Sequence, residues 1–153
     1  MRRLPHLAWL PALVLVAGAC APGPEPETDT AGFGETITVA LPVGAYPEEF
    51  HLHDPADAFY TVDGVAATGA EEIAFTLTVE LPELGRVTGF SQMTAVCEGG
   101  GQWSTARTPD LPAEIHGGTH TFPYTCAPPG GTGDLLIGIE HHGFRLDFTG
   151  TPG

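Results

Sequence analysis

Histidine is the residue type in this sequence with the widest chemistry, because a neutral imidazole binds zinc or copper and exchanges its proton near neutral pH. The segment "FHLHD" contains His51 and His53, followed at once by Asp54. In a strand these two imidazoles lie on the same face, about 7 Å apart. Together with His116 and His141 they make one candidate zinc or copper site. The alternative interpretation places the same side chains on a solvent-facing strand and in turns, without a metal.

The sequence lacks the patterns of nucleophilic or thiol catalysis. Ser104 precedes His116 in the chain, but no Gly-x-Ser-x-Gly motif surrounds it. The three cysteines form no Cys-x-x-Cys pair that would indicate redox chemistry. We therefore expect a protein that is not an enzyme and needs no cofactor. A metalloenzyme built on the histidine cluster is the alternative.

A long connection, residues 99–118, carries the candidate binding residues Trp103 and Arg107. Connections longer than about 12–15 residues in a compact domain are usually functional or disordered. A tryptophan in such a segment can stack on a sugar or anchor a protein partner. We expect a protein or carbohydrate partner at this loop. The alternative is that Trp103 closes one end of the hydrophobic core.

The charge balance excludes one class of partner. The chain has five arginines, no lysine and nineteen acidic residues, for a formal net charge of −14. Nucleic-acid binding needs cations that replace the counterions of the phosphates, so we expect no nucleic acid. The acidity itself favours solubility at a crowded surface over recognition.

The hydrophobic pattern has a period of two and predicts strands. In "EEIAFTLTVEL" the apolar side chains from Ile73 to Leu81 alternate with small and polar ones, and the same alternation marks segments 35–41, 120–126, 134–140 and 144–149. Shorter strands are expected at 49–53 and 58–62, and a turn at 82–85. About eight strands without a helical segment predict an all-β, antiparallel β-sandwich, immunoglobulin-like or jelly-roll-like.

Two cysteines of this domain are expected to form a disulfide. Cys97 and Cys126 are the cysteines that remain when Cys20 is assigned to the N-terminal segment described below, and an oxidising compartment would join them. The bond would close a loop of about thirty residues and stabilise the fold by roughly 3–4 kcal/mol.

Residues 1–19 are expected to form an export signal. Two arginines precede an apolar run from Leu7 to Ala19, which as a helix is about 20 Å long and too short for a bilayer core of about 30 Å. It ends in Ala17-Gly18-Ala19-Cys20, which resembles the lipobox of bacterial lipoproteins. The resemblance implies cleavage before Cys20, acylation of its sulfur and insertion of the acyl chains into the lipid bilayer.

The sequence divides into three segments. Residues 1–19 are a lipoprotein signal peptide, residues 20–34 a lipidated, acidic and proline-rich tether, and residues 35–150 the β-sandwich domain. Ala21, rather than an aspartate, follows the cysteine, and this resembles lipoproteins sorted to the outer membrane. We expect an exported protein with a non-enzymatic binding or structural module on a bacterial membrane.

Overall fold

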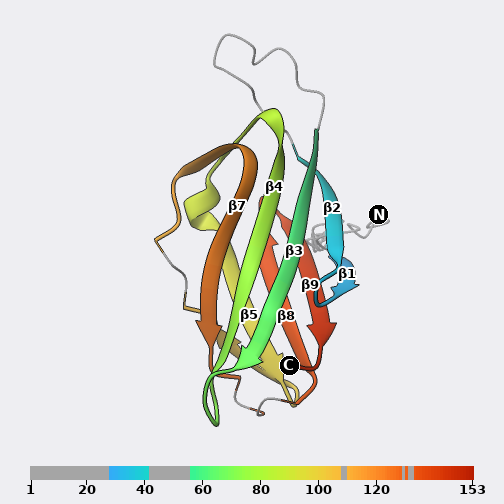
Figure 1. The fold of residues 1–153 in the computed structure, drawn as a ribbon, viewed down its shortest axis with the longest axis vertical. Helices are drawn as coiled ribbons and strands as arrows, with labels where there is room; N and C mark the ends of the chain where they lie inside the picture. The colour runs from blue at the N-terminus through green and yellow to red at the C-terminus, as the bar shows by residue number, and fades with distance from the viewer. Residues whose placement is uncertain (1–27, 42–55, 108–109, 129, 131–132) are drawn as a thin grey trace, which may run out of the picture.

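Two β-sheets packed face to face form the protein (Figure 1). The computed structural model describes residues 28–41, 56–107, 110–128, 130 and 133–153. One sheet has the strand order β1-β9-β8-β5-β6 and the other the order β2-β3-β4-β7. The strands are β1 (Thr28–Gly32), β2 (Thr36–Leu41), β3 (Ala56–Ala67), β4 (Ile73–Thr88), β5 (Thr94–Gly99), β6 (Gln102–Thr105), β7 (Glu114–Cys126), β8 (Leu135–His141) and β9 (Phe144–Gly150).

Alternation in the sequence decides which side chains enter the core. In β2 every second residue is buried, and in β4 the run from Ile73 to Val79 buries its four apolar side chains almost completely. The inward side chains of both sheets interlock in one hydrophobic cluster, whose largest members include Tyr60, Phe90, Tyr124 and Phe148. The predicted all-β sandwich is therefore confirmed.

The strand order identifies the topology within that class. A hairpin of β5 and β6 leads back to β7 on the opposite sheet, and a second crossing leads to the hairpin of β8 and β9. The orders β3-β4-β7 and β9-β8-β5-β6 match the strands A-B-E and G-F-C-C′ of immunoglobulin-like domains. β1 adds a strand parallel to β9 at one edge, and β2 extends the other sheet.

A disulfide ties the two sheets together. Cys97 of β5 and Cys126 of β7 are bonded, with their Cα atoms 6.4 Å apart and 29 positions apart in sequence. Both side chains are buried in the core. The predicted pairing is confirmed, and its place differs from the B–F bond of antibody domains because it joins the strands that correspond to C and E.

The outer surface of the four-stranded sheet carries a row of threonines across all four strands. Thr36, Thr61, Thr78 and Thr121 lie opposite one another in register, and the hydroxyls of Thr36 and Thr61 are 2.7 Å apart. Phe59, which is 37% exposed, lies in the next row. We call this surface the threonine face.

Two boundaries differ from the sequence prediction. The tether predicted for residues 20–34 is too long, because Thr28–Gly32 form β1 and pair in parallel with residues 145–149 of β9. This pairing joins segments more than a hundred residues apart, which an alternation pattern cannot indicate. The strand predicted at 49–53 lies outside the described residues, whereas the segment 58–62 lies within β3.

The turn predicted at 82–85 is also wrong. β4 continues through these four residues as an irregularity, since Leu81 pairs with Gly118 and Arg86 with His116. Four residues of β4 thus oppose the single residue Gly117, whose missing Cβ would lie 2.3 Å from the carbonyl oxygens of Pro82 and Glu83. The glycine lets the strand bulge instead of reversing. No helix in the part of the chain that the structure describes is long and apolar enough to cross a membrane.

Candidate functional site

The structure describes only some of the residues proposed as metal ligands. His51, His53 and Asp54 lie outside the described residues. His116 is exposed on β7, where its Nε2 lies 2.9 Å from Glu114, while His141 is buried at the end of β8 in the other sheet. The described residues contain no group of three or more histidine, cysteine or acidic side chains suited to a metal. The zinc or copper site therefore stays a prediction.

His116 belongs to a small polar cluster at one end of the molecule. Glu114 also pairs with Arg86, and this guanidinium holds the pKa of the Glu114 carboxyl below its usual value. His120 is half-buried, and its Nε2 lies 2.5 Å from the carbonyl oxygen of His116. Each histidine of this cluster thus has a local structural contact.

The segment 99–118 is not one loop. Gly100 and Gly101 form a tight turn with positive φ angles, and the chain returns at once as β6. β7 then begins at Glu114 in the second sheet. The two turn glycines, which sequence analysis counted as part of a long loop, are the signal for a hairpin.

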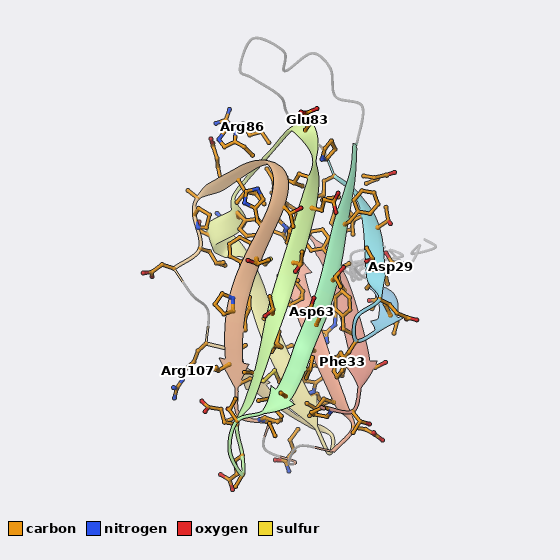
Figure 2. The ribbon with its side chains drawn as sticks, viewed as in Figure 1. Asp29, Phe33, Asp63, Glu83, Arg86 and Arg107 are labelled. Atoms are coloured by element: carbon orange, nitrogen blue, oxygen red, sulfur yellow. A yellow bond between two sulfur atoms is a disulfide. The ribbon has the colours of Figure 1, made fainter. Side chains whose placement is uncertain are left out.

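Trp103 lies on β6 opposite Glu98 and is 49% exposed. The guanidinium carbon of Arg145 lies 4.9 Å from the centre of its ring. Arg107, the other candidate binding residue of the sequence analysis, lies beyond β6, where its backbone N–H donates to the carbonyl of Thr125 at 2.7 Å. Figure 2 shows Arg107 at the opposite end of β7 from Arg86. The cation that accompanies Trp103 is therefore Arg145.

Arg145 is the centre of a charged network on the five-stranded sheet. Its Nε donates to Asp147 at 2.9 Å and its Nη1 to Glu140 at 3.1 Å. Its Nη2 lies over Gly138, where a Cβ would be only 3.0 Å away. The glycine therefore leaves the space in which the arginine lies across the sheet. We call the outer surface of this sheet, from Trp103 through Arg145 to Glu140, the Arg145 face.

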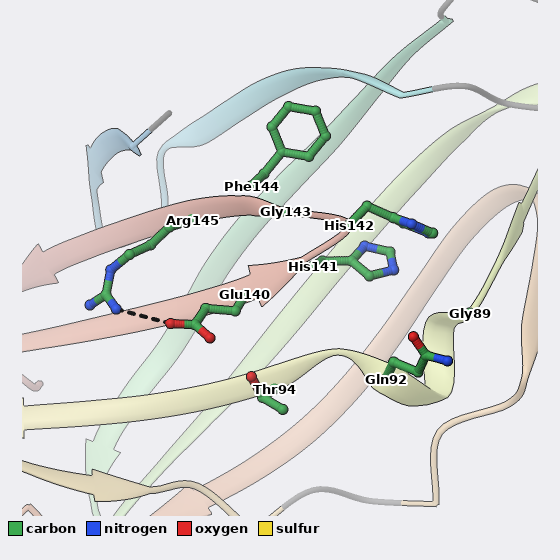
Figure 3. A pocket seen from close by; sticks show the side chains of 9 residues that line it. All are labelled: Gly89, Gln92, Thr94, Glu140, His141, His142, Gly143, Phe144 and Arg145. Atoms are coloured by element: carbon green, nitrogen blue, oxygen red, sulfur yellow. Dashed lines mark hydrogen bonds and ion pairs between the residues drawn. The ribbon is translucent and has the colours of Figure 1, made fainter. Parts of the chain in front are cut away.

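A pocket of about 510 Å³ opens at the end of the Arg145 face, beside the β8–β9 turn (Figure 3). Glu140 and Arg145 belong both to the pocket wall and to the network that reaches Trp103. The remaining polar side chains of the wall come from two neighbouring segments, the start of β5 and the β8–β9 turn, namely Gln92, Thr94, His141 and His142.

His141 is the most unusual residue of this wall. It is 5% exposed, its Nδ1 lies 2.9 Å from the hydroxyl of Tyr60 on the opposite sheet, and its ring packs edge-on against Phe90. Its Nε2 is buried without a hydrogen-bond partner among the described residues. Burial, and secondarily the neighbouring His142, lower the pKa of His141 to about 4. The imidazole is thus neutral at pH 7.

Sequence analysis missed most of this site. It placed His141 in a turn and assigned no role to Arg145, Gln92 or Thr94. The outward phase of Arg145 in "FRLDF" follows from the alternation, and a glycine inside the apolar run "LLIGIE" indicates a close approach at Gly138. Neither signal predicts that the guanidinium of Arg145 contacts the ring of Trp103.

No family model matches the chain, and no curated protein matches it. Among solved structures it is similar to the archaellum periplasmic stator protein FlaG from Sulfolobus acidocaldarius, with a TM-score of 0.43 and 8% identity over 60% of this chain and 99% of that one. It is also similar to an uncharacterized β-sandwich protein from Clostridium difficile 630, with a TM-score of 0.47 and 10% identity over 84% and 98% of the two chains. At these values the likeness says nothing of function.

Proposed function

We propose that this protein is a lipid-anchored, non-enzymatic recognition module of a bacterial cell envelope, which binds its ligand on the Arg145 face. The observation that carries the proposal is Trp103, a large aromatic side chain 49% exposed on a strand rather than on a loop. Exposed aromatic residues beside arginine are typical of the centres of binding surfaces.

The Arg145 face is held in one arrangement before any ligand arrives. Arg145 is fixed by two carboxylates, and β5, which pairs with β6, is fixed by the disulfide to the opposite sheet. A surface that is already ordered loses little conformational entropy on binding. This order supports recognition.

The proposed anchor is the acylated Cys20 of the lipobox-like segment. Because β1 begins at Thr28, only residues 21–27 separate the lipid from the first strand. Fully extended, seven residues span about 25 Å. The domain would therefore stay close to the bilayer, with ligands limited to components of the envelope and its surroundings.

The anchor is tested by mass spectrometry of the protein purified from membranes. We expect an N-terminal Cys20 that carries acyl chains, and a Cys20→Ala variant that is neither acylated nor retained in the membrane fraction. An unmodified N-terminus at any other residue, in a protein released from the membrane, contradicts the anchor.

Recognition is tested with the mature chain made without its acyl anchor and sedimented with isolated envelopes of the producing bacterium. Trp103→Ala should reduce the bound fraction about tenfold or more. Phe59→Ala is the matched control, because it removes the other large apolar side chain that is exposed among the described residues, on the threonine face. Equal binding of both variants, or no binding of the unaltered chain, contradicts the proposal.

A further inference from the structure

We propose that the pocket beside His141 and the ring of Trp103 form two ends of one site for an uncharged oligosaccharide. This inference rests on the proposed function and names the ligand class of the same face. It depends on three features: an unpartnered buried nitrogen, a lining of uncharged polar groups, and the separation along β5 between the pocket and the residue opposite Trp103.

The buried Nε2 atom of His141 is an unsatisfied polar group in a residue of the pocket wall. The residue is more than nine-tenths buried, it lines the pocket, and its other ring nitrogen is held by Tyr60. If the Tyr60 hydroxyl donates to Nδ1, Nε2 carries the proton and needs an acceptor, whereas the other tautomer needs a donor. A sugar hydroxyl is both donor and acceptor, so it satisfies either tautomer.

The rest of the wall favours a ligand without charge. Gln92 and Thr94 provide an amide and a hydroxyl, and His142 provides a second imidazole. The two charged groups, Glu140 and Arg145, are already paired with each other, and Arg145 is also paired with Asp147. Glu140 would repel a bound anion, and Arg145 would repel a bound cation. A hydroxyl-rich ligand can form hydrogen bonds to both side chains without separating them.

The distance from the pocket to Trp103 indicates a chain of sugars rather than one. Thr94 lies in the pocket wall, and Glu98, four residues further along β5, lies opposite Trp103. Four residues of a strand span about 13 Å. Trp103 can stack against a sugar ring, whose apolar face suits an aromatic surface, and Arg145 lies between the two ends.

Trp103 also reports the binding directly. The sequence contains two tryptophans, and the other one, Trp9, lies within the segment predicted to be cleaved. In the mature chain the intrinsic fluorescence therefore comes from the site itself. The probes are chitotetraose, cellotetraose and maltotetraose with their monosaccharides, and purified peptidoglycan tested by sedimentation.

We expect at least one tetrasaccharide to shift the Trp103 emission with saturation, and its monosaccharide to bind at least about tenfold more weakly, since it reaches only one end. His142→Ala and Thr94→Val should weaken the tetrasaccharide about tenfold, the effect of one lost hydrogen bond at a ligand hydroxyl. His116→Ala and Thr121→Val are the matched controls and should bind unchanged. Sedimentation with peptidoglycan, together with a tetrasaccharide that competes with it, would identify the wall polymer as the source of the sugar.

Three results overturn the inference. They are no binding of any probe, equal affinity for monosaccharide and tetrasaccharide, and binding that the pocket variants leave unchanged. If envelopes bind in a Trp103-dependent manner but no saccharide competes, the recognition function stands and the ligand is not a sugar. If envelopes do not bind at all, the proposed function itself fails.

Discussion

The two outer faces of this sandwich follow from the same alternation but differ in how their side chains interact. On the threonine face, four β-branched residues lie side by side across the strands, and the hydroxyls of Thr36 and Thr61, on neighbouring strands, are 2.7 Å apart. On the Arg145 face, one side chain reaches Asp147, Glu140 and Trp103 on three different strands. The difference indicates that substitutions should be tolerated on the first face and coupled on the second.

The largest effect is expected at the bond that holds the two sheets together. Replacing both Cys97 and Cys126 by alanine removes a loop closed over 29 positions. The free energy of unfolding should fall by about 3–4 kcal/mol, chiefly because the unfolded chain gains freedom. Chemical denaturation, followed by the fluorescence of Trp103 and by far-ultraviolet circular dichroism, measures it. A loss below about 1 kcal/mol would contradict the role given to this bond.

The second effect concerns acid pH and arises at His141, in the wall of the pocket at the end of the Arg145 face. Unfolded His141 takes up a proton near pH 6.5, whereas in the folded protein its pKa is about 4. Above pH 6.5 both states are neutral and nothing is lost; as the pH falls from 6.5 to 4.5, only the unfolded state gains the proton. Stability should fall by roughly 2–3 kcal/mol over this range.

The matched variants for this effect are His141→Gln and His116→Gln. The first should flatten the dependence of the unfolding free energy on pH between 4.5 and 6.5, and the second should leave it unchanged. If both variants keep the same slope, carboxylates rather than His141 cause the acid sensitivity.

The third effect tests the coupling on the Arg145 face. Arg145→Met keeps much of the side chain's length but leaves Asp147, whose side chain is 14% exposed, without its ion pair. We expect a loss of about 1–2 kcal/mol in unfolding free energy, and a red-shifted Trp103 emission as water replaces the guanidinium. Arg107→Met, at an exposed arginine outside this network, serves as the control. An unshifted emission would show that Arg145 does not cover the ring in solution.

The smallest effect is expected on the threonine face. Thr78→Val, in the middle of the threonine row, retains a β-branched side chain and should change the unfolding free energy by no more than about 0.5 kcal/mol. Thermal and chemical denaturation measure it. A loss above about 1 kcal/mol would mean that the threonine hydroxyls form a coupled network, and the contrast between the two faces would disappear.

The layers of the fold could be predicted from the sequence because burial repeats every two residues. The alternation assigned Ile73, Phe75 and Leu77 to the core, where the structure buries them. The disulfide followed from the even number of cysteines left in the domain. These features depend on near neighbours or on composition.

What could not be predicted depends on which strands meet. Nothing in residues 28–32 indicates a parallel partner at 145–149, and nothing near Trp103 indicates Arg145. His141 reads as a turn residue because its neighbours are His142 and Gly143, yet Tyr60 from the opposite sheet fixes it in the core. The candidate site is therefore made of contacts between distant segments, and such contacts leave little trace in a single sequence.

The parallel pairing of β1 with β9 has a mechanical consequence. The five residues from Thr28 to Gly32 pair with Arg145 to Thr149, the strand that carries Arg145 itself. A pull along the axis of β1 loads all of these hydrogen bonds at once in shear, whereas a pull across it would open them one after another. Force that enters at the N-terminal end of the domain along this axis therefore passes first through the strand that holds Arg145. An attached load would be carried by the backbone of the Arg145 face before the rest of the sandwich is strained.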